Sequence, residues 1–399
     1  MARRASHPDY HGAMSDATNG SSSSLSATRL ASVRRHLATL NADPARTTPV
    51  DAILITQAEN RRYATGFTGS AGLVMVSATD AAIFTDFRYI EQAGSQSPAY
   101  EVVRIEGSAW DAIATRAAAH GVRNLLVEAD NLTLDAGRRL RTAVATHAPD
   151  LHLEEGTDLL VPLRQVKDAT EIESMRRAVL IADRAIEAIG ASLRPGMTER
   201  QVAWKLEVHM REAGATGLSF PTIVASGPNG AMPHHRPGDR PIQAGEPIVI
   251  DMGCVVDGYC SDMTRTLVLG EPDETFWKVY TTVLAAQETC EDGLRAGMTG
   301  VAADALARET IGRAGFDPIE AFGHSTGHGV GLAIHEAPWV SRGERGNAPI
   351  PVGAVVTVEP GIYLPEWGGV RIEDMVVVGE ARCHVMTTAH KRPVVAIAG

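Results

Sequence analysis

Short apolar runs and segments with helical spacing alternate along the first 160 residues. Leucine and valine side chains at positions 30–40 recur every three or four residues, which predicts a helix. Short runs rich in β-branched and aliphatic residues predict five strands, and a helix is expected near 110–120. The predicted strands are 50–56, 73–76, 81–85, 101–105 and 124–127. Strands that alternate with helices indicate an α/β domain. We place this domain at residues 28–160.

Two helices are predicted to open the second part of the chain, residues 161–399. Asp168 and Glu171 form a D-x-x-E start signal, and an apolar face with helical spacing follows them. A second helix is expected to begin at Thr198, with Gln201 in the position of a capping box. The second part therefore begins with a pair of amphipathic helices.

A pair of carboxylates follows these helices. The apolar run 247–250 ends in Asp251, and Asp262 comes eleven residues later. Asp257-Gly258 lies between them and predicts a hairpin, because this dipeptide tolerates the positive φ of tight turns. Such a hairpin would bring Asp251 and Asp262 side by side. Two adjacent carboxylates repel, so we expect a positive group between them, either metal ions or an arginine.

Three segments of the second part recur in the same order, which predicts an internal repeat. The first two pairs are 101 residues apart and the third pair is 108 apart. The matching segments are Leu193–Thr198 with Leu294–Thr299, His234–Pro237 with His335–Pro338, and Gly245–Asp251 with Gly353–Glu359. Two α+β halves packed face to face would place both histidines and both pairs of acids at one interface.

Composition narrows the classes of function. A net charge of −11 argues against a general binder of nucleic acid or of anionic membranes, because phosphate contacts need clustered lysine and arginine. Four cysteines without a CxxC pair favour free thiols in the cytoplasm. No apolar run approaches the ~18 residues of a membrane span. We expect the polar residues 1–27 to be a disordered tail, with Met14 as an alternative start.

The second half of the repeat supplies further polar groups. The glycine-rich segment Gly323–Glu336 contains His324, His328 and His335, and glycine leaves room for imidazoles to approach a ligand. Glu359 follows a predicted strand, and Glu373 lies fourteen residues beyond it. Three histidines and two acids so arranged favour a site over isolated core residues.

Together these residues resemble the "pita-bread" metallopeptidases, the family of methionine aminopeptidases, Xaa-Pro aminopeptidases and prolidases. Five residues match the metal ligands of that family in order, namely Asp251, Asp262, His328, Glu359 and Glu373. The resemblance covers residues 30–399. It includes Asn60–Ser70, which is similar to the amino-terminal domain of the proline-specific branch. Methionine aminopeptidases lack that domain, so the Xaa-Pro branch is favoured.

The resemblance implies two divalent metal ions that activate a hydroxide nucleophile. Asp262 and Glu373 would bridge the ions, Asp251 would bind one of them, and His328 with Glu359 would bind the other. Four carboxylates balance two divalent charges. Oxygen-rich ligation with one imidazole suits Mn²⁺ and tolerates Co²⁺, Fe²⁺ or Zn²⁺.

The resemblance also implies roles in catalysis and in proline binding. Glu359 would carry a proton to the leaving nitrogen, while His234 and His335 would hold the scissile peptide. The repeat selects His234 over its neighbour His235 as the inward residue. The residues expected around the proline are Phe220, His324, Tyr363 and Arg371. Phe220 stands where some relatives carry tyrosine, and Arg371 is expected either to pair with a carboxylate ligand or to face the substrate carboxylate.

The predicted function is an Xaa-Pro aminopeptidase acting on proline-containing peptides, with an Xaa-Pro dipeptidase (prolidase) as the alternative. Two remoter alternatives are a metal-free enzyme resembling creatinase and a non-enzymatic binding protein on the same fold. Relatives of both kinds lose acidic ligands, whereas all five ligands are present here. Family likeness further implies a homodimer.

Overall fold

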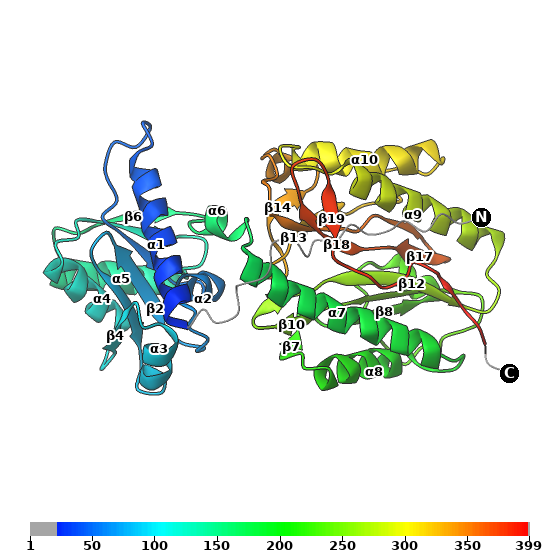
Figure 1. The fold of residues 1–399 in the computed structure, drawn as a ribbon, viewed down its shortest axis with the longest axis horizontal. Coiled ribbons are helices and arrows are strands. Elements are labelled where there is room, and N and C mark those ends of the chain that lie inside the picture. Colours follow the sequence, from blue (N-terminus) through cyan, green and yellow to red (C-terminus); the bar gives the residue numbers. More distant parts are fainter. Residues whose placement is uncertain (1–21, 398–399) are drawn as a thin grey trace. The chain divides into compact units, whose positions relative to one another are not determined.

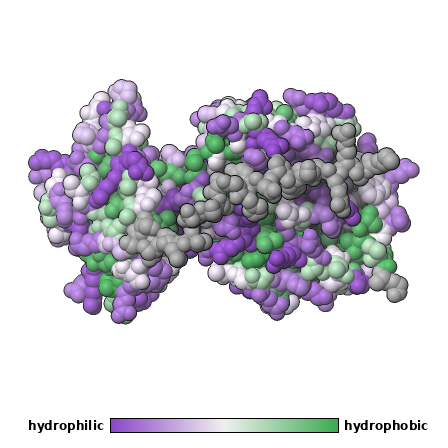
Figure 2. Space-filling model, viewed as in Figure 1, coloured by the Kyte–Doolittle hydropathy of each residue, from purple (hydrophilic) through white to green (hydrophobic). Residues whose placement is uncertain are grey.

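The structure is a computed structural model that describes residues 22–397. The chain divides into two compact units, residues 1–163 and 164–399. In both units, hydrophilic residues are interspersed with hydrophobic ones on the face that Figure 2 shows. None of the helices in residues 22–397 has both the length and the apolar character needed to cross a membrane.

The first unit contains a six-stranded mixed sheet in the order β4-β3-β2-β1-β5-β6 (Figure 1). Its strands are β1 (Ala52–Ile55), β2 (Leu73–Ser77), β3 (Ala81–Thr85), β4 (Glu101–Arg104), β5 (Asn124–Glu128) and β6 (His152–Gly156). The accompanying helices are α1 (Ser22–Asn41), α2 (Ala58–Thr65), α3 (Ile90–Gln96), α4 (Ala109–Ala119) and α5 (Leu134–His147). The expected hairpin of β2 and β3 is present, and β1 pairs parallel with β5. The α/β class predicted for this part of the chain is confirmed.

The amino-terminal boundary differs from the prediction. Helix α1 begins at Ser22, so residues 22–27 are helical and do not belong to a disordered tail. Ser26 and Arg29 are buried on this helix, and the Arg29 guanidinium lies 4.3 Å from the ring centroid of Tyr63 on α2. These polar residues gain packing partners that their sequence pattern does not reveal. Residues 1–21, the rest of the predicted tail, lie outside the described residues.

The two main sheets of the second unit lie between two pairs of helices, with α7 and α8 on one side and α9 and α10 on the other (Figure 1). The helices are α7 (Ala169–Ser192), α8 (Glu199–Glu212), α9 (Glu274–Gly293) and α10 (Gly300–Arg313), and the short α6 (Val161–Arg164) precedes them. Asp168 and Thr198 form capping boxes with Glu171 and Gln201, as their spacing predicts. Each pair of helices buries its apolar face against the neighbouring strands.

The strands of the second unit form two main sheets, ordered β20-β12-β9-β8 and β14-β13-β15-β18-β19. The first sheet contains β8 (Ile223–Ser226), β9 (Pro247–Met252), β12 (Met263–Leu269) and β20 (Val394–Val395). The second contains β13 (Gly327–Gly329), β14 (Glu336–Val340), β15 (Val355–Val358), β18 (Asp374–Val378) and β19 (Cys383–Val385). The smaller strands are β7 (Gly217–Leu218), β10 (Cys254–Val256), β11 (Tyr259–Cys260), β16 (Gly361–Leu364) and β17 (Gly368–Arg371).

The internal repeat is visible in backbone detail. Thr198 and Thr299 cap α8 and α10, two helices of 14 residues each. Gly196 and Gly297 have φ values of 86° and 83° and donate matching hydrogen bonds of 2.9 Å to Ile242 and Ile350. The predicted internal repeat and the α+β class of this part of the chain are therefore confirmed.

The predicted hairpin is also present. Its turn residues Asp257 and Gly258 have φ values of 49° and 81° and connect β10 to β11. Beyond it, β9 pairs antiparallel with β12, which sets Asp251 opposite Thr264. This register brings Asp262, the residue before β12, to the end of β9 that carries Asp251.

Candidate active site

The predicted ligands lie at equivalent ends of the central strands of the two halves. Asp251 lies near the end of β9 and Glu359 directly follows β15, while Asp262 and Glu373 directly precede β12 and β18. His328 lies in the middle of β13. Because β9 pairs with β12 and β15 with β18, each half contributes two acids to the same place.

A cavity of about 340 Å³ lies over these strand ends. All of the predicted site residues except Tyr363 line it. Those residues are Phe220, His234, Asp251, Asp262, His324, His328, His335, Glu359, Arg371 and Glu373. Tyr363 is 8% exposed and lies behind the wall, where it bonds to two lining residues.

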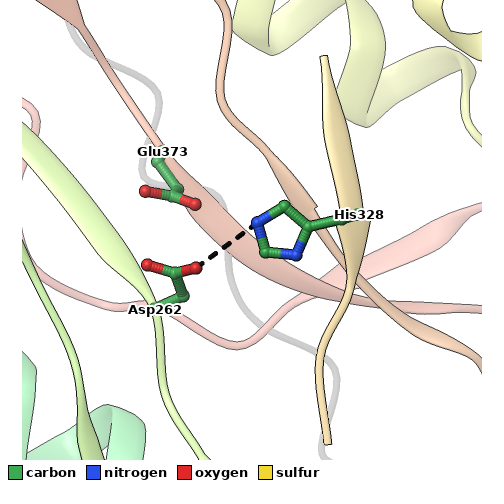
Figure 3. A group of neighbouring side chains, drawn as sticks. All are labelled: Asp262, His328 and Glu373. Carbon is green, nitrogen blue, oxygen red and sulfur yellow. Dashed lines mark ion pairs between the residues drawn. The ribbon is translucent and has the colours of Figure 1, made fainter. Parts of the chain in front are cut away.

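Asp262, His328 and Glu373, three of the predicted ligands, form a compact group of side chains that face one another (Figure 3). One oxygen or nitrogen atom from each of the three side chains lies within 4.8 Å of the others. His328 Nε2 lies 3.6 Å from Asp262 Oδ2 and 3.4 Å from Glu359 Oε1. Asp262, His328 and Glu373 are close enough together to hold one cation.

The imidazole of His328 is held in the form that binds metal. Its Nδ1 lies 3.1 Å from the carbonyl oxygen of Gly329, which fixes the ring proton there and leaves Nε2 as a lone pair. Burial, reinforced by the nearby His335, lowers the pKa of His328 to about 4. A neutral Nε2 lone pair that faces two carboxylate oxygens is repelled by them unless a cation lies between.

Burial raises the pKa values of the four carboxylates. The pKa of Asp262 lies well above its usual range because burial and the charges of Glu373 and Asp251 all favour the protonated form. Burial likewise raises the pKa of Glu373, and raises that of Glu359 to about 8. Burial also raises the pKa of Asp251, although the Arg371 guanidinium opposes this shift. The chain alone therefore does not stabilise four ionised acids here.

Two carboxylate oxygen atoms of this group have no donor among the described residues to offset their negative charge. Asp251 Oδ1 and Glu373 Oε1 are buried and accept no hydrogen bond from the described residues. A buried carboxylate oxygen without a donor is costly. Because two divalent cations would balance four carboxylates and give both oxygens a partner, the residues present fit a dinuclear metal centre.

Arg371 holds one side of the group. Its Nη2 lies 2.6 Å from Asp251 Oδ2, its Nη1 donates to the Tyr363 hydroxyl at 2.8 Å, and its Nε donates to Thr264 Oγ1 at 3.0 Å. Of the two expectations for Arg371, pairing with a predicted ligand is the one realised. Tyr363 in turn lies 2.7 Å from His324 Nε2. Burial raises the pKa of Tyr363 to about 12 and lowers that of His324 to about 3, so both remain neutral.

The repeated histidines lie on the cavity wall. His234 lines the cavity, whereas Nε2 of its neighbour His235 lies 2.8 Å from Glu199 Oε2. His335 packs edge-on against His328, with ring centroids 4.4 Å apart. The inward position that the repeat predicted for His234 agrees with this arrangement.

Several contributing residues were not identified from the sequence. Thr357 Oγ1 lies 3.4 Å from Glu359 Oε1 and accepts a hydrogen bond from the His328 N–H, and Thr264 donates to Glu373 Oε2 at 2.7 Å. Thr357 stands two residues before Glu359 and Thr264 two after Asp262, and alternate residues of a strand share one face. Both threonines could have been found from the sequence, because each is a polar residue on the face of an apolar strand that carries a predicted ligand. Arg236 and Trp339 also line the cavity, but no pattern in the sequence around them indicates this.

Comparisons with known proteins agree with this geometry. The model of "Metallopeptidase family M24" matches residues 173–380, and that of "Creatinase/Prolidase N-terminal domain" matches residues 29–166. The uncharacterized peptidase YqhT of Bacillus subtilis is 40% identical over 346 residues, which cover 87% of this chain and 96% of that protein.

Two solved structures extend the comparison to the fold. The Xaa-Pro dipeptidase from Bacillus anthracis superposes with a TM-score of 0.86 at 39% identity, covering 92% of this chain and 99% of that one. The X-Pro aminopeptidase from Thermotoga maritima superposes with a TM-score of 0.79 at 37% identity, covering 87% and 98%.

Proposed function

The chain belongs to metallopeptidase family M24, and we propose that it hydrolyses the peptide bond between an amino-terminal residue and proline. The observation that carries this proposal is the buried group of four acids and one neutral imidazole, with two carboxylate oxygens that lack donors among the described residues. Two solved relatives that each cover most of this chain are named for action on Xaa-Pro peptides. The principal candidate is an Xaa-Pro aminopeptidase.

We assign five residues as metal ligands. Asp262 and Glu373 would bridge two ions, Asp251 would complete one site, and His328 with Glu359 would complete the other. When bound, the two ions supply Lewis acidity and a hydroxide nucleophile at neutral pH. Mn²⁺ is the ion that we expect, since hard oxygen donors dominate, and Co²⁺, Fe²⁺ or Zn²⁺ are also compatible.

The remaining steps belong to the chain's own side chains. Glu359 lines the cavity, and we assign it the transfer of a proton to the leaving proline nitrogen. His234 and His335 lie on the cavity wall, where they can hydrogen-bond the scissile carbonyl as charge develops on it. Phe220 and Pro221 add apolar surface for the proline ring.

A direct experiment tests the reaction. The protein is freed of metal with chelator, reloaded with Mn²⁺, and assayed on a peptide Xaa-Pro-Xaa and on its Xaa-Ala-Xaa counterpart. We expect metal-dependent cleavage of the proline peptide, with the alanine peptide cleaved far more slowly. Asp262→Ala should lose both the bound metal and the activity, while Asp257→Ala in the adjacent turn should keep both. Full activity in excess chelator would contradict the proposal.

The second candidate is an Xaa-Pro dipeptidase, which the name of the Bacillus anthracis relative favours. The two candidates share the same chemistry and differ in what lies beyond the proline. Comparing kcat/KM for Xaa-Pro and Xaa-Pro-Xaa separates them, since a dipeptidase rejects the longer peptide.

Two further properties stay proposals. We propose a homodimer, which analytical ultracentrifugation of the Mn²⁺-loaded protein can test directly. We also propose a cytoplasmic location, which the free and buried cysteines Cys254, Cys260, Cys290 and Cys383 favour because cytosolic thiols are kept reduced. Fractionation of the producing cells tests this location.

A further inference from the structure

Two arginines line the active-site cavity, and they differ in their partners. Arg371 is buried and forms an ion pair with Asp251. Arg236 lies on the exposed wall of the cavity and makes no hydrogen bond or ion pair with any residue in the range 22–397. The cavity therefore has one cation that is satisfied internally and one that is available to a ligand.

The other arginines around this loop are paired with acids. Arg240 makes a bidentate ion pair with Glu246, with both N–O distances at 2.6 Å. Arg200 pairs with Asp239 at 3.3 Å. Asp239, an acid only three residues from Arg236, is thus engaged elsewhere. Arg236 is the loop's cation that faces the cavity, and the loop supplies it with no counter-charge.

The backbone on both sides of Arg236 is held in place. Glu199 is fully buried, and its Oε2 lies 2.8 Å from His235 Nε2 and accepts a hydrogen bond from the Gly238 N–H at 3.1 Å. Its other oxygen accepts hydrogen bonds from Ser226 and Asn229. Residues before and after Arg236 are therefore tied to one buried carboxylate. An anchored loop reduces the entropy that a binding residue loses when it contacts its ligand.

The charge of Arg236 selects which end of a peptide it meets. An amino terminus is positive and is repelled by a guanidinium, whereas a carboxylate accepts two parallel hydrogen bonds from it. His234, two residues away on the same loop, lines the same cavity. We propose that Arg236 binds the terminal carboxylate of a short peptide substrate, on the proline side of the scissile bond, and so favours short peptides over internal sequences. This inference rests on the proposed function.

Four substrates test the inference. They are a dipeptide Xaa-Pro, a tripeptide Xaa-Pro-Xaa, and the carboxyl-terminal amide of each. The wild-type protein loaded with Mn²⁺ should cleave an acid with a higher kcat/KM than the matching amide. Arg236→Gln should reduce that preference by about 10- to 100-fold, the range expected for hydrogen bonds to a charged group. The loss should appear in KM, with kcat little changed.

Two further variants sharpen the experiment. Arg236→Lys keeps the charge but loses the bidentate geometry, so it should restore part of the preference for the acid. Arg313→Gln removes an exposed cation of α10 that pairs with Glu309 and does not line the cavity, and it should leave the preference intact. If the effect of Arg236→Gln occurs in the dipeptide pair, the carboxylate is that of proline. If it occurs in the tripeptide pair, the carboxylate is that of the next residue.

The failures of the two proposals are distinguishable. If the wild-type protein cleaves none of the four peptides, the proposed function is wrong and the inference falls with it. If the wild-type protein cleaves acids and amides equally, or if Arg236→Gln slows both equally, the proposed function stands and the inference is wrong.

Discussion

Arg265 Nη2 lies 2.7 Å from Asp374 Oδ1, and both side chains are almost fully buried. Arg265 on β12 is opposite Ile250, and Asp374 on β18 is opposite Val358. The ion pair thus joins the two main sheets of the second unit. Arg265 Nη1 also donates to the backbone carbonyl of Glu373 at 2.7 Å, so the same side chain positions a predicted ligand.

Replacing Arg265 with methionine should destabilise the second unit. Both partners of the pair are almost fully buried, and the change leaves an Asp374 oxygen and the carbonyls of Glu373 and Ala389 without their donor. Breaking a buried pair by removing one partner costs about 3–5 kcal/mol. We expect a loss of this size in the free energy of unfolding, measured by urea denaturation in excess chelator.

A matched control is Arg200→Met, which removes an exposed ion pair with Asp239. Exposed pairs contribute about 0–1 kcal/mol, so this variant should unfold close to wild type. Equal stabilities of the Arg265 and Arg200 variants would show that the pair between the two sheets contributes nothing.

The sequence was enough to predict the fold class and the positions that meet at the site. The order of Asp251, Asp262, His328, Glu359 and Glu373 carries the family resemblance, and the repeat set His234 equivalent to His335. Such features can be predicted from spacing because strand periodicity and helix capping depend on residues that are close together in the chain. The partner of Arg371 could not be predicted in this way, since an ion pair with Asp251 spans 120 residues and depends on how the two halves pack. Helix α1 began earlier than expected for the same reason, because its polar residues pack against α2.

Metal removal should make stability depend on pH. Burial raises the pKa values of Asp262 and Glu373 well above their usual range, and that of Glu359 to about 8. The folded metal-free protein therefore binds protons more tightly than the unfolded chain. Its stability should fall as pH rises from about 4.5 to about 8, and the loss is complete above the folded pKa values.

Bound Mn²⁺ should cancel this loss by neutralising the carboxylates. Added metal at one hundred times its Kd stabilises a protein by about 2.7 kcal/mol. Differential scanning calorimetry between about pH 5 and pH 8 should show a gap between loaded and metal-free Tm values that widens as pH rises. Asp262→Asn with Glu373→Gln should flatten the dependence in the metal-free protein. A gap that stays constant or narrows with rising pH would contradict the assignment of these acids.

Thr357 should support metal binding through Glu359 and His328, both of which it contacts. Thr357→Val preserves shape but removes the hydroxyl. Loss of such supporting hydrogen bonds lowers metal affinity by about 10- to 100-fold. Isothermal titration with Mn²⁺ measures the change. Thr282→Val is the control, since Thr282 is also buried and its hydroxyl donates to the Lys278 carbonyl within α9, away from the predicted ligands. Equal affinities for the two variants would contradict this role.

The adjacent histidines His234 and His235 should have separable effects on catalysis. His234 lines the cavity, whereas His235 points to the buried Glu199. Removing one donor to a developing oxyanion costs about 10²- to 10³-fold in kcat, so His234→Ala should lower kcat by that amount.

His235→Ala should act differently, because it leaves Glu199 with one donor fewer and loosens the loop. An unsatisfied buried partner costs about 1–3 kcal/mol in the free energy of unfolding, and KM should rise while kcat falls less than in His234→Ala. His235→Gln, which keeps an N–H donor near Glu199, should recover part of that stability. Steady-state kinetics and urea denaturation of the three variants measure both effects. A larger loss of kcat in His235→Ala than in His234→Ala would reverse the assignment, because it would mean that the loop turns His235 and not His234 toward the scissile bond.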